Sequence, residues 1–267
     1  MSADVPDTDT IRWLTALLLC PSGATLSHHS AATLFGGIVP DDGVHVSVRG
    51  PSRPKVAGIT AHRRRGPVAT TRHRDVPTTS AAQTFLDLAR ALDLPDLVVL
   101  GDSLVKAAAL SPEALIQATA HAPRGRAARA ARLIRAGVES PMESRLRVLL
   151  VLAGLPEPTV QHSVRDASGR ERFRLDLAYP DAKIAIEYDG RHHIEREDQW
   201  TADLSRREEL EAEGWRVIVV TGSDYYKAPD QVASRVWEAL RARGVPARAP
   251  RGQHSILSGS ATARRSA

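Results

Sequence analysis

Cysteine is nearly absent from this chain of 267 residues, and its scarcity excludes several classes of structure. The single cysteine, Cys20, cannot form a disulfide within the chain, so a reducing compartment is expected. A zinc finger built on cysteine ligands is excluded for the same reason. Aromatic residues make up 4% of the chain and hydrophobic residues 42%, so the core is expected to consist mainly of Leu, Val and Ala.

Long hydrophobic runs are absent as well. No stretch approaches the roughly 18 apolar residues that a membrane helix needs. The most apolar stretch near the start, residues 13–20, follows no basic segment, so we expect no signal peptide. These features favour a cytoplasmic protein without a membrane partner.

Lysine is also scarce, since only four of the 36 basic residues are lysines. The formal net charge is +5, but residues 244–267 contain four arginines and no acid, and therefore carry +4 of it. This segment is rich in Gly, Ser, Ala and Pro, which predicts a disordered basic tail. The overall charge thus says little about nucleic-acid binding by the folded part.

The most informative segment, residues 173–193, places acidic residues in two strand-like runs. Residues 173–179 and 183–188 are typical of strands, and the Pro-Asp-Ala sequence between them is typical of a turn. A hairpin centred near Asp181 brings Asp176 opposite Ile186 or Glu187. Strand side chains alternate, so Glu187 and Asp189 point to the same side.

Asp176, Glu187 and Asp189 then converge at one end of the hairpin. Three carboxylates this close repel one another unless they are protonated or bridged by a metal. Oxygen ligands suit a hard cation, Mg²⁺ or Mn²⁺. The alternative is a salt-bridged surface hairpin, whose acids are neutralised by neighbouring arginines: Arg172, Arg174 and Arg191.

The spacing of these acids resembles the PD-(D/E)XK signature of restriction-endonuclease-like nucleases. In that family a strand Asp and an acid on the neighbouring strand hold the metal, which implies Asp176 and Glu187 as ligands. A lysine usually stands two residues after the second acid, where this chain has Asp189. The pattern Glu-Tyr-Asp-Gly-x-x-His is similar to the very-short-patch-repair (Vsr-type) branch, whose members lack the lysine. The resemblance implies a catalytic role for His193, with His192 as the adjacent candidate.

Further parts of the chain share this resemblance. Glu143 opens a helix upstream, where the superfamily often carries another metal-site Glu. Downstream, Trp200-x-x-Asp203-x-x-Arg206-Arg207 leads to Gly214-Trp215 and a last core strand. The resemblance covers residues 139–243 and implies an α/β fold, a mixed sheet flanked by helices.

What the resemblance implies is an endonuclease that uses Mg²⁺ or Mn²⁺ to hydrolyse DNA phosphodiester bonds. The backbone carbonyl of Tyr188 would be a third ligand, and Asp189 would add a ligand or orient water. His193 would act as general base or assist the leaving group, while Glu143 would support the site or hold a second metal. Four arginines are expected to contact DNA: Arg145, Arg191, Arg206 and Arg207. The acids of the helix at 198–213 must face away from phosphate.

Residues 11–122 are expected to form a smaller α+β region after a flexible segment, residues 1–10. We expect helices at residues 12–19, 30–34, 79–92, 94–109 and 112–120, and strands at 44–48, 56–62 and 68–72. Residues 26–36 and 78–89 resemble AbiEi-type proteins, the antitoxin side of type IV toxin–antitoxin systems. This resemblance implies a cognate toxin or another protein as a partner. Members usually begin with a winged-helix unit, which we expect to be absent or truncated here because little chain precedes Ile11.

Two arginine-rich clusters, at residues 62–74 and 123–138, are either nucleic-acid contacts or solvated faces, and the second is expected to be a basic helix or linker. Three histidines, His28, His29 and His45, can be read as metal ligands, but we expect capped or exposed side chains.

Two rivals to the nuclease hypothesis are considered, a non-catalytic antitoxin-like regulator that binds DNA or protein, and a purely structural module. Many double-strand cutters dimerise or cut twice, so a homodimer is considered too.

Overall fold

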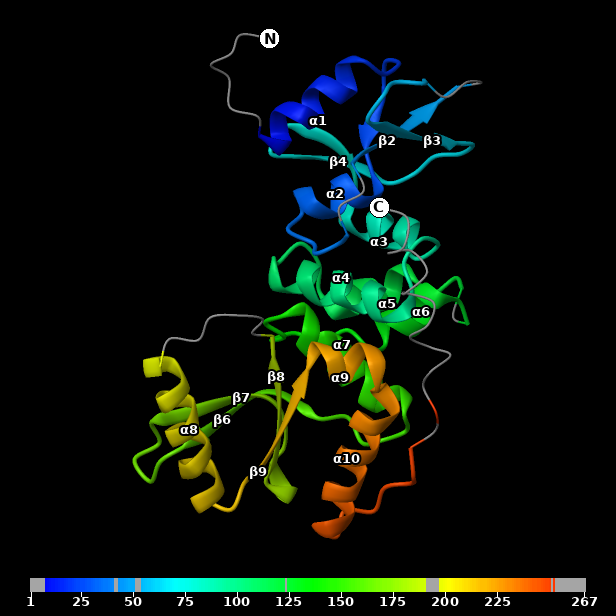
Figure 1. Ribbon diagram of the computed structural model, residues 1–267. Coiled ribbons are helices and arrows are strands. Elements are labelled where there is room, and N and C mark those ends of the chain that lie inside the picture. Colours follow the sequence, from blue (N-terminus) through cyan, green and yellow to red (C-terminus); the bar gives the residue numbers. More distant parts are fainter. Residues whose placement is uncertain are drawn as a thin grey trace. The chain divides into compact units, whose positions relative to one another are not determined.

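The computed structural model describes residues 8–40, 43–50, 54–122, 124–190, 197–250 and 252, with the backbone alone for residues 197–203. The chain divides into two compact units, residues 1–136 and 137–267, and each unit has a sheet of its own (Figure 1). Both units combine helices with strands, as the predicted α/β class requires. Among the described residues, no helix has the length and apolar character needed to cross a membrane.

The first unit contains a five-stranded sheet in the order β3-β2-β1-β5-β4. Its strands are β1 (Thr25–Leu26), β2 (Val44–Arg49), β3 (Ile59–Arg64), β4 (Thr70–His73) and β5 (Val76–Thr79). Its helices are α1 (Asp9–Leu18), α2 (His28–Leu34), α3 (Ala81–Leu88), α4 (Leu94–Lys106), α5 (Pro112–Ala118) and α6 (Arg126–Ala131). The pairs β1–β5 and β2–β3 are parallel, whereas β1–β2 and β4–β5 are antiparallel.

Local sequence signals explain where these helices begin. The side chains of Ser80, Asp93 and Ser111 each accept a backbone N–H of the following turn, so each caps the helix that follows it. The helix predicted at residues 79–92 is shorter than expected, since α3 ends at Leu88, and a separate helix begins after Asp93. Trp13 of α1 and Leu26 of β1 are buried in the core of this unit.

The arginines around α6 belong partly to the fold itself. Three alanines of this helix are buried, and α6 packs against α4. Arg126 donates to the backbone carbonyls of Ala89 and Leu92, at 3.4 and 2.8 Å, and Arg135 donates to those of Arg132 and Ile134. These two guanidinium groups therefore satisfy carbonyls at chain turns, and the predicted basic helix or linker is a packed part of the first unit.

The second unit is built on a four-stranded sheet in the order β6-β7-β8-β9. Its strands are β6 (Thr159–Arg165), β7 (Glu171–Tyr179), β8 (Ile184–Asp189) and β9 (Arg216–Thr221). Its helices are α7 (Pro141–Leu152), α8 (Glu197–Ala212), α9 (Gly222–Lys227) and α10 (Pro229–Ala242), with a 3₁₀ turn, Pro180–Ala182, between β7 and β8. The pairs β6–β7 and β7–β8 are antiparallel, and the pair β8–β9 is parallel.

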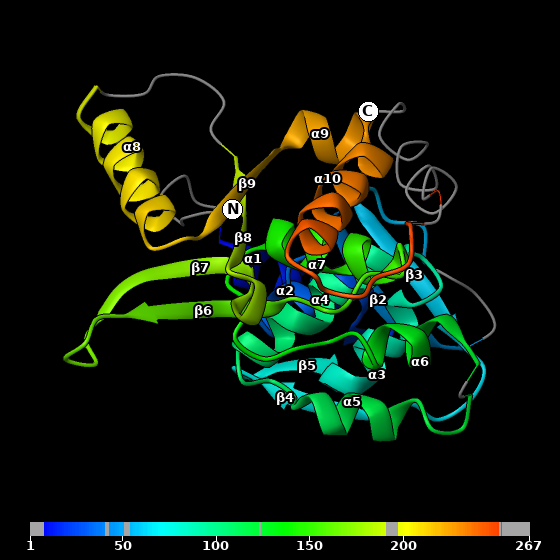
Figure 2. The same cartoon turned by 90° about the horizontal axis from the view of Figure 1, so that it is seen from below.

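Helices cover both faces of this sheet, as Figures 1 and 2 show. On one face, Leu149 of α7 and Val236 of α10 share a core with Ile186 of β8. On the other face, Leu210 of α8 and Trp215 share a smaller core with Ala185. Neighbouring residues of β8 thus point to opposite helical layers, which explains why the first half of this strand, Ile184–Ile186, is apolar at every position.

The predicted disordered tail does not begin at residue 244. Val245 and Ala247 pack against the larger core, and the indole of Trp237 donates to the carbonyl of Ala247 at 3.0 Å. Apolar residues early in the tail are held by α10, which composition alone could not indicate. Residues 253–267 lie outside the described part of the chain.

Candidate active site in the second unit

The hairpin of β7 and β8 has the register that places Asp176 level with Glu187. Tyr179 pairs with Ile184 and Leu177 with Ile186, so the next position along the two strands joins Asp176 and Glu187. Pairing ends at Leu177, because β8 leaves β7 at this point and continues beside β9. The backbone N–H of Tyr188 donates instead to Oδ2 of Asp176, at 3.3 Å.

At this level of the sheet, the regular alternation of side chains between the two faces is interrupted in both β6 and β7. Leu175 packs in the α8 core and Leu177 in the opposite core, although residues two apart in a regular strand share a face. In β6, Val160 and Val164 are divided between the two cores in the same way. Val160 pairs with Leu177 and His162 with Leu175, but the ladder skips the pair between them, Gln161 and Asp176.

Asp176 occupies an environment that opposes its ionisation. Burial and, after it, the carboxylates of Glu143 and Glu187 raise its pKa from the usual 3.8 to about 6. The N–H of Tyr188 and the guanidinium of Arg206 act in the opposite direction. Asp176 is therefore influenced by Glu187 and by Glu143, which has the larger effect, whereas Asp189 of the expected triplet is not among the groups that shift its pKa.

Glu143 reaches this cluster from the first turn of α7. Ser140 caps the helix by accepting the N–H of Glu143 at 3.2 Å, and Pro141 follows at a favourable position. The Glu143 side chain is 5% exposed, and its Oε2 accepts the N–H of Glu139 at 3.1 Å and the amide of Gln161 at 2.8 Å. Two donors thus satisfy a buried carboxylate that would otherwise be costly.

Glu187 is held in a different way, by a bidentate ion pair. Arg206 of α8 donates to Oε1 and Oε2 of Glu187 at 2.7 and 2.9 Å, and also to the carbonyl of Arg174 at 3.0 Å. Two parallel hydrogen bonds of this kind fix both side chains. The Asp-x-x-Arg motif of the helix therefore places its arginine on the acid of β8.

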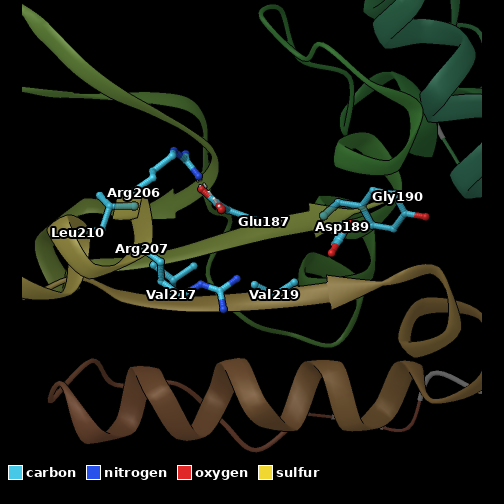
Figure 3. A pocket seen from close by; sticks show the side chains of 9 residues that line it. Glu187, Asp189, Gly190, Arg206, Arg207, Leu210, Val217 and Val219 are labelled. Carbon is cyan, nitrogen blue, oxygen red and sulfur yellow. Dashed lines mark hydrogen bonds and ion pairs between the residues drawn. The ribbon is translucent and has the colours of Figure 1, made fainter. Parts of the chain in front are cut away.

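A cavity of about 220 Å³ lies beside this ion pair. Its lining comes from β8, β9 and α8 and includes Glu187, Asp189, Arg206 and Arg207. Figure 3 shows Glu187 pointing toward Arg206, while the side chain of Arg207 extends along β9 toward Val219. The cavity combines two acids with two arginines, which suits a ligand that carries negative charge near a cation.

The salt-bridged surface hairpin considered from the sequence does not form at Arg172 or Arg174, and its third arginine, Arg191, lies outside the described residues. Arg172 binds Glu209 and Glu213 of α8, and Arg174 binds Glu139. Neither arginine neutralises Asp176 or Asp189, because the outer part of the hairpin turns them toward other acids. Glu208, Glu209 and Glu211 are exposed, as expected for the acidic side of α8.

Of the other residues predicted for the site, some lie near Tyr188 or the cavity, and others fall outside the described part of the chain. Arg145 and Asp189 both influence Tyr188: burial raises the pKa of the Tyr188 phenol, Asp189 adds to the rise, and Arg145 lowers it. Arg207 is exposed at the cavity. His193, His192 and Arg191 lie outside the described residues, and the side chain of Asp203 is likewise not described.

The donor set fits a hard divalent cation in its chemistry. Among the described residues, Asp176 and Glu143 use only one oxygen each for hydrogen bonds, Oδ2 and Oε2, and the second oxygen of each accepts none. Both oxygens of Glu187 are bound to Arg206. Among the described residues, no three His, Cys, Asp or Glu side chains form a group that could hold a metal ion as the side chains stand.

Gln161 is the residue of this site that sequence reasoning missed. It has no charge and matches no catalytic motif. Its position opposite Asp176 depends on the pairing of β6 with β7, which nothing in the local sequence specifies. The one available signal is a polar residue in a strand next to the acids.

Comparison with known proteins defines the class of this unit. The family model REase_MTES_1575, which describes a restriction-endonuclease-like family, matches residues 158–240, from β6 to α10. The second unit is therefore a restriction-endonuclease-like domain, which follows a smaller α+β unit as predicted.

Over nearly its full length, the chain is similar to two proteins of Mycobacterium tuberculosis. These are "Uncharacterized protein MT2308" of strain CDC 1551 / Oshkosh and "Uncharacterized protein Rv2248" of strain H37Rv. Each is 27% identical over 243 residues, which cover 88% of this chain and 89% of the relative. No solved structure matches the chain.

A cluster of histidines in the first unit corrects another expectation. His29 and His45 are buried, not exposed, and His45 Nδ1 lies 2.9 Å from His62 Nε2. The ring of His28 stacks on His62 with centroids 3.5 Å apart. The pairing of β2 with β3 brings His45 and His62 together as diagonal neighbours, because His62 pairs with Ser47, two residues after His45.

Proposed function

We propose that the second unit is an endonuclease domain that hydrolyses DNA phosphodiester bonds with Mg²⁺ or Mn²⁺. The observation that carries this proposal is the convergence of Asp176, Glu187 and Glu143 where β8 leaves β7. Carboxylates are placed together at the expense of stability when their charge has a function. The restriction-endonuclease-like class of the domain supports the same reading.

Asp176 and Glu187 would hold the cation, with the carbonyl of Tyr188 as a third ligand and Glu143 next to them. A bound divalent cation supplies Lewis-acid chemistry, by polarising a phosphate and lowering the pKa of water. The protein contributes hard oxygen donors and arginines: Arg206 and Arg207 bind the phosphate backbone and Asp189 orients water. His193, by its likeness to the Vsr-type branch, moves the proton.

The likeness of the second unit to the Vsr-type branch and that of the first unit to AbiEi-type proteins are also part of this proposal. The Vsr-type likeness rests on Glu187-Tyr188-Asp189-Gly190 followed by His193, and the AbiEi-type likeness of the first unit on residues 26–36 and 78–89. DNA is the proposed partner, a cognate toxin is the proposed protein partner of the first unit, and a homodimer would allow both strands to be cut.

A second candidate function is favoured by one observation. Arg206 binds both oxygens of Glu187, the residue expected to hold the metal. A guanidinium in this position neutralises the acid as a metal would. On this reading the domain retains a nuclease fold and acts as a non-catalytic regulator that binds DNA or protein.

A cleavage assay separates the two functions. The purified chain is incubated with supercoiled plasmid and with single- and double-stranded oligonucleotides, in Mg²⁺, Mn²⁺ or EDTA. The nuclease proposal expects metal-dependent cleavage that is lost in the double variant Asp176→Ala, Glu187→Ala. Asp181→Ala, in the exposed turn between the same two strands, is the matched control and should cleave like the wild type.

Equal cleavage by wild type and double variant on every substrate would rule out the nuclease proposal. DNA binding without cleavage, retained in the double variant, would establish the regulator instead.

A further inference from the structure

Gln161 has a backbone conformation that is unusual for its place in the fold. Its φ is +49°, in the left-handed region that residues with a side chain rarely occupy. The other described non-glycine residues with positive φ lie at turns or at helix ends, whereas Gln161 lies inside β6. Strained residues of this kind persist where their surroundings hold them, and they cluster at functional sites.

The strained backbone directs the Gln161 side chain onto Glu143. The amide nitrogen donates to Oε2 of Glu143 at 2.8 Å, and this bond connects residues 18 positions apart, on β6 and α7. The ladder between β6 and β7 is interrupted at this level, where Asp176 faces Gln161 in register. The same distortion therefore removes Gln161 from regular pairing and brings its amide to the carboxylate beside Asp176.

The amide also determines which oxygen of Glu143 remains available. Both of its hydrogen-bond donors, the Glu139 N–H and the Gln161 amide, bind Oε2. Within the described chain, Oε1 accepts no hydrogen bond. An amide is a suitable anchor in this position, because it donates to a carboxylate and adds no charge that would compete with a cation.

We propose that Gln161 is a positioning residue, which holds Glu143 beside Asp176 so that the Oε1 oxygen of Glu143 faces the cation. This inference rests on the proposed function and deepens it, because it makes Glu143 a part of the metal site and assigns the distortion of β6 to that task. A purely structural role would require Gln161 only to satisfy a buried acid at the start of α7.

The test combines metal binding with stability in the full-length protein. Mn²⁺ binding is measured by electron paramagnetic resonance without DNA, and thermal unfolding is followed in EDTA. Gln161→Met keeps the length of the side chain and removes the donor, whereas Gln161→Gly also relieves the backbone strain. Loss of a partner that orients a metal ligand weakens metal binding by about 10-fold to 100-fold, and we expect this loss in both variants.

The unfolding midpoint distinguishes positioning from structure. We expect Gln161→Gly to unfold at or above the wild-type temperature while its Mn²⁺ affinity falls, because relief of strain offsets the lost hydrogen bond. Lys183→Gly is the matched control, since Lys183 also has a positive φ, +48°, in a turn of the same unit. This control should gain stability in the same way and bind Mn²⁺ like the wild type.

Wild-type Mn²⁺ affinity in Gln161→Met would overturn the role of Gln161 and leave the proposed function standing. A wild-type protein that binds no Mn²⁺ would overturn the proposed function, and with it the role of Gln161.

Discussion

At Asp176, burial and two neighbouring carboxylates raise the pKa to about 6, so the ionised form is disfavoured at neutral pH. Between pH 3.8 and about 6 the folded state holds more protons on this group than the unfolded state does. Its contribution to stability therefore falls as the pH rises through this window and stays unfavourable above it. The Asp176 carboxylate therefore destabilises the fold at neutral pH.

Replacement of this carboxylate by an amide is expected to stabilise the protein. Asp176→Asn keeps an oxygen for the Tyr188 N–H and removes the charge. We expect its free energy of unfolding to exceed that of the wild type by about 1 kcal/mol at pH 7.5, after allowance for solvent screening. Urea unfolding measured in EDTA at pH 7.5 and pH 4 checks this, because the gain should vanish at the lower pH. Asp181→Asn is the control and should show no gain at either pH.

Arg206 and a cation would compete for the same oxygens of Glu187. We expect Arg206→Ala to bind Mn²⁺ about fivefold more tightly, which corresponds to the loss of a competing ion pair worth roughly 1 kcal/mol. Titration calorimetry without DNA measures the affinity directly. Arg172→Ala, which breaks ion pairs to the same helix at Glu209 and Glu213, should leave it unchanged. Weaker Mn²⁺ binding in Arg206→Ala would show that the arginine supports the site.

The residues of the site could be predicted where they belong to one local pattern. Asp176 and Glu187 follow from two strands and a turn, and Arg206 from a helical motif. The pairing of Arg206 with Glu187, and of Arg172 with α8, depends on how α8 packs across the sheet. Contacts of this kind join segments that are far apart in the chain, so the local spacing of residues does not predict them.

At the scale of elements, the β7–β8 hairpin was the most predictable part. Alternating apolar residues and the Pro-Asp-Ala turn determine its register to within one residue, and the structure selects Glu187 over Ile186 as the position level with Asp176. The change of face at Gln161 and Asp176 could not be predicted, because β6 and β7 remain in register on both sides of it.

In the first unit, α2, β2 and β3 join their histidines into a pH-sensitive cluster. Burial and, next, the neighbouring His62 lower the pKa of His28 from 6.5 to about 3, although Asp87 acts in the opposite direction. An unfolded chain would bind a proton at His28 below pH 6.5, whereas the folded chain would bind it only near pH 3. Stability is therefore lost as the pH falls through this window.

His28→Asn should remove part of this acid sensitivity. Asparagine tolerates the positive φ of this position, +51°, and does not titrate. We expect the variant to lose less stability than the wild type between pH 7 and pH 4.5, as measured by urea unfolding. His121→Asn, at an exposed histidine, should retain the wild-type dependence. An unchanged pH dependence in His28→Asn would mean that His28 is not the group that titrates.

At the scale of the whole molecule, the chain consists of two units with separate cores. Trp13 and Leu26 belong to the core of the first unit, whereas Leu149 and Ile186 belong to that of the second. All the acids and arginines of the candidate active site that the structure describes come from the second unit. Chemistry at this site should therefore require only residues 137–250.

Expression of residues 137–250 alone tests this independence. We expect a folded fragment, with a cooperative thermal transition and the Mn²⁺ affinity of the full chain. Circular dichroism and electron paramagnetic resonance provide the two measurements. A fragment that folds but binds Mn²⁺ more weakly would show that the first unit contributes to the site.

The acids at the end of β7 and β8 are proposed to hold a hard cation. The most direct measurement is the anomalous difference map of a crystal soaked in Mn²⁺. We predict a peak within about 2.3 Å of oxygens from Asp176 and Glu187, with Arg206 displaced from at least one oxygen of Glu187. A map without a peak there, in which Arg206 still binds both oxygens of Glu187, would contradict the account.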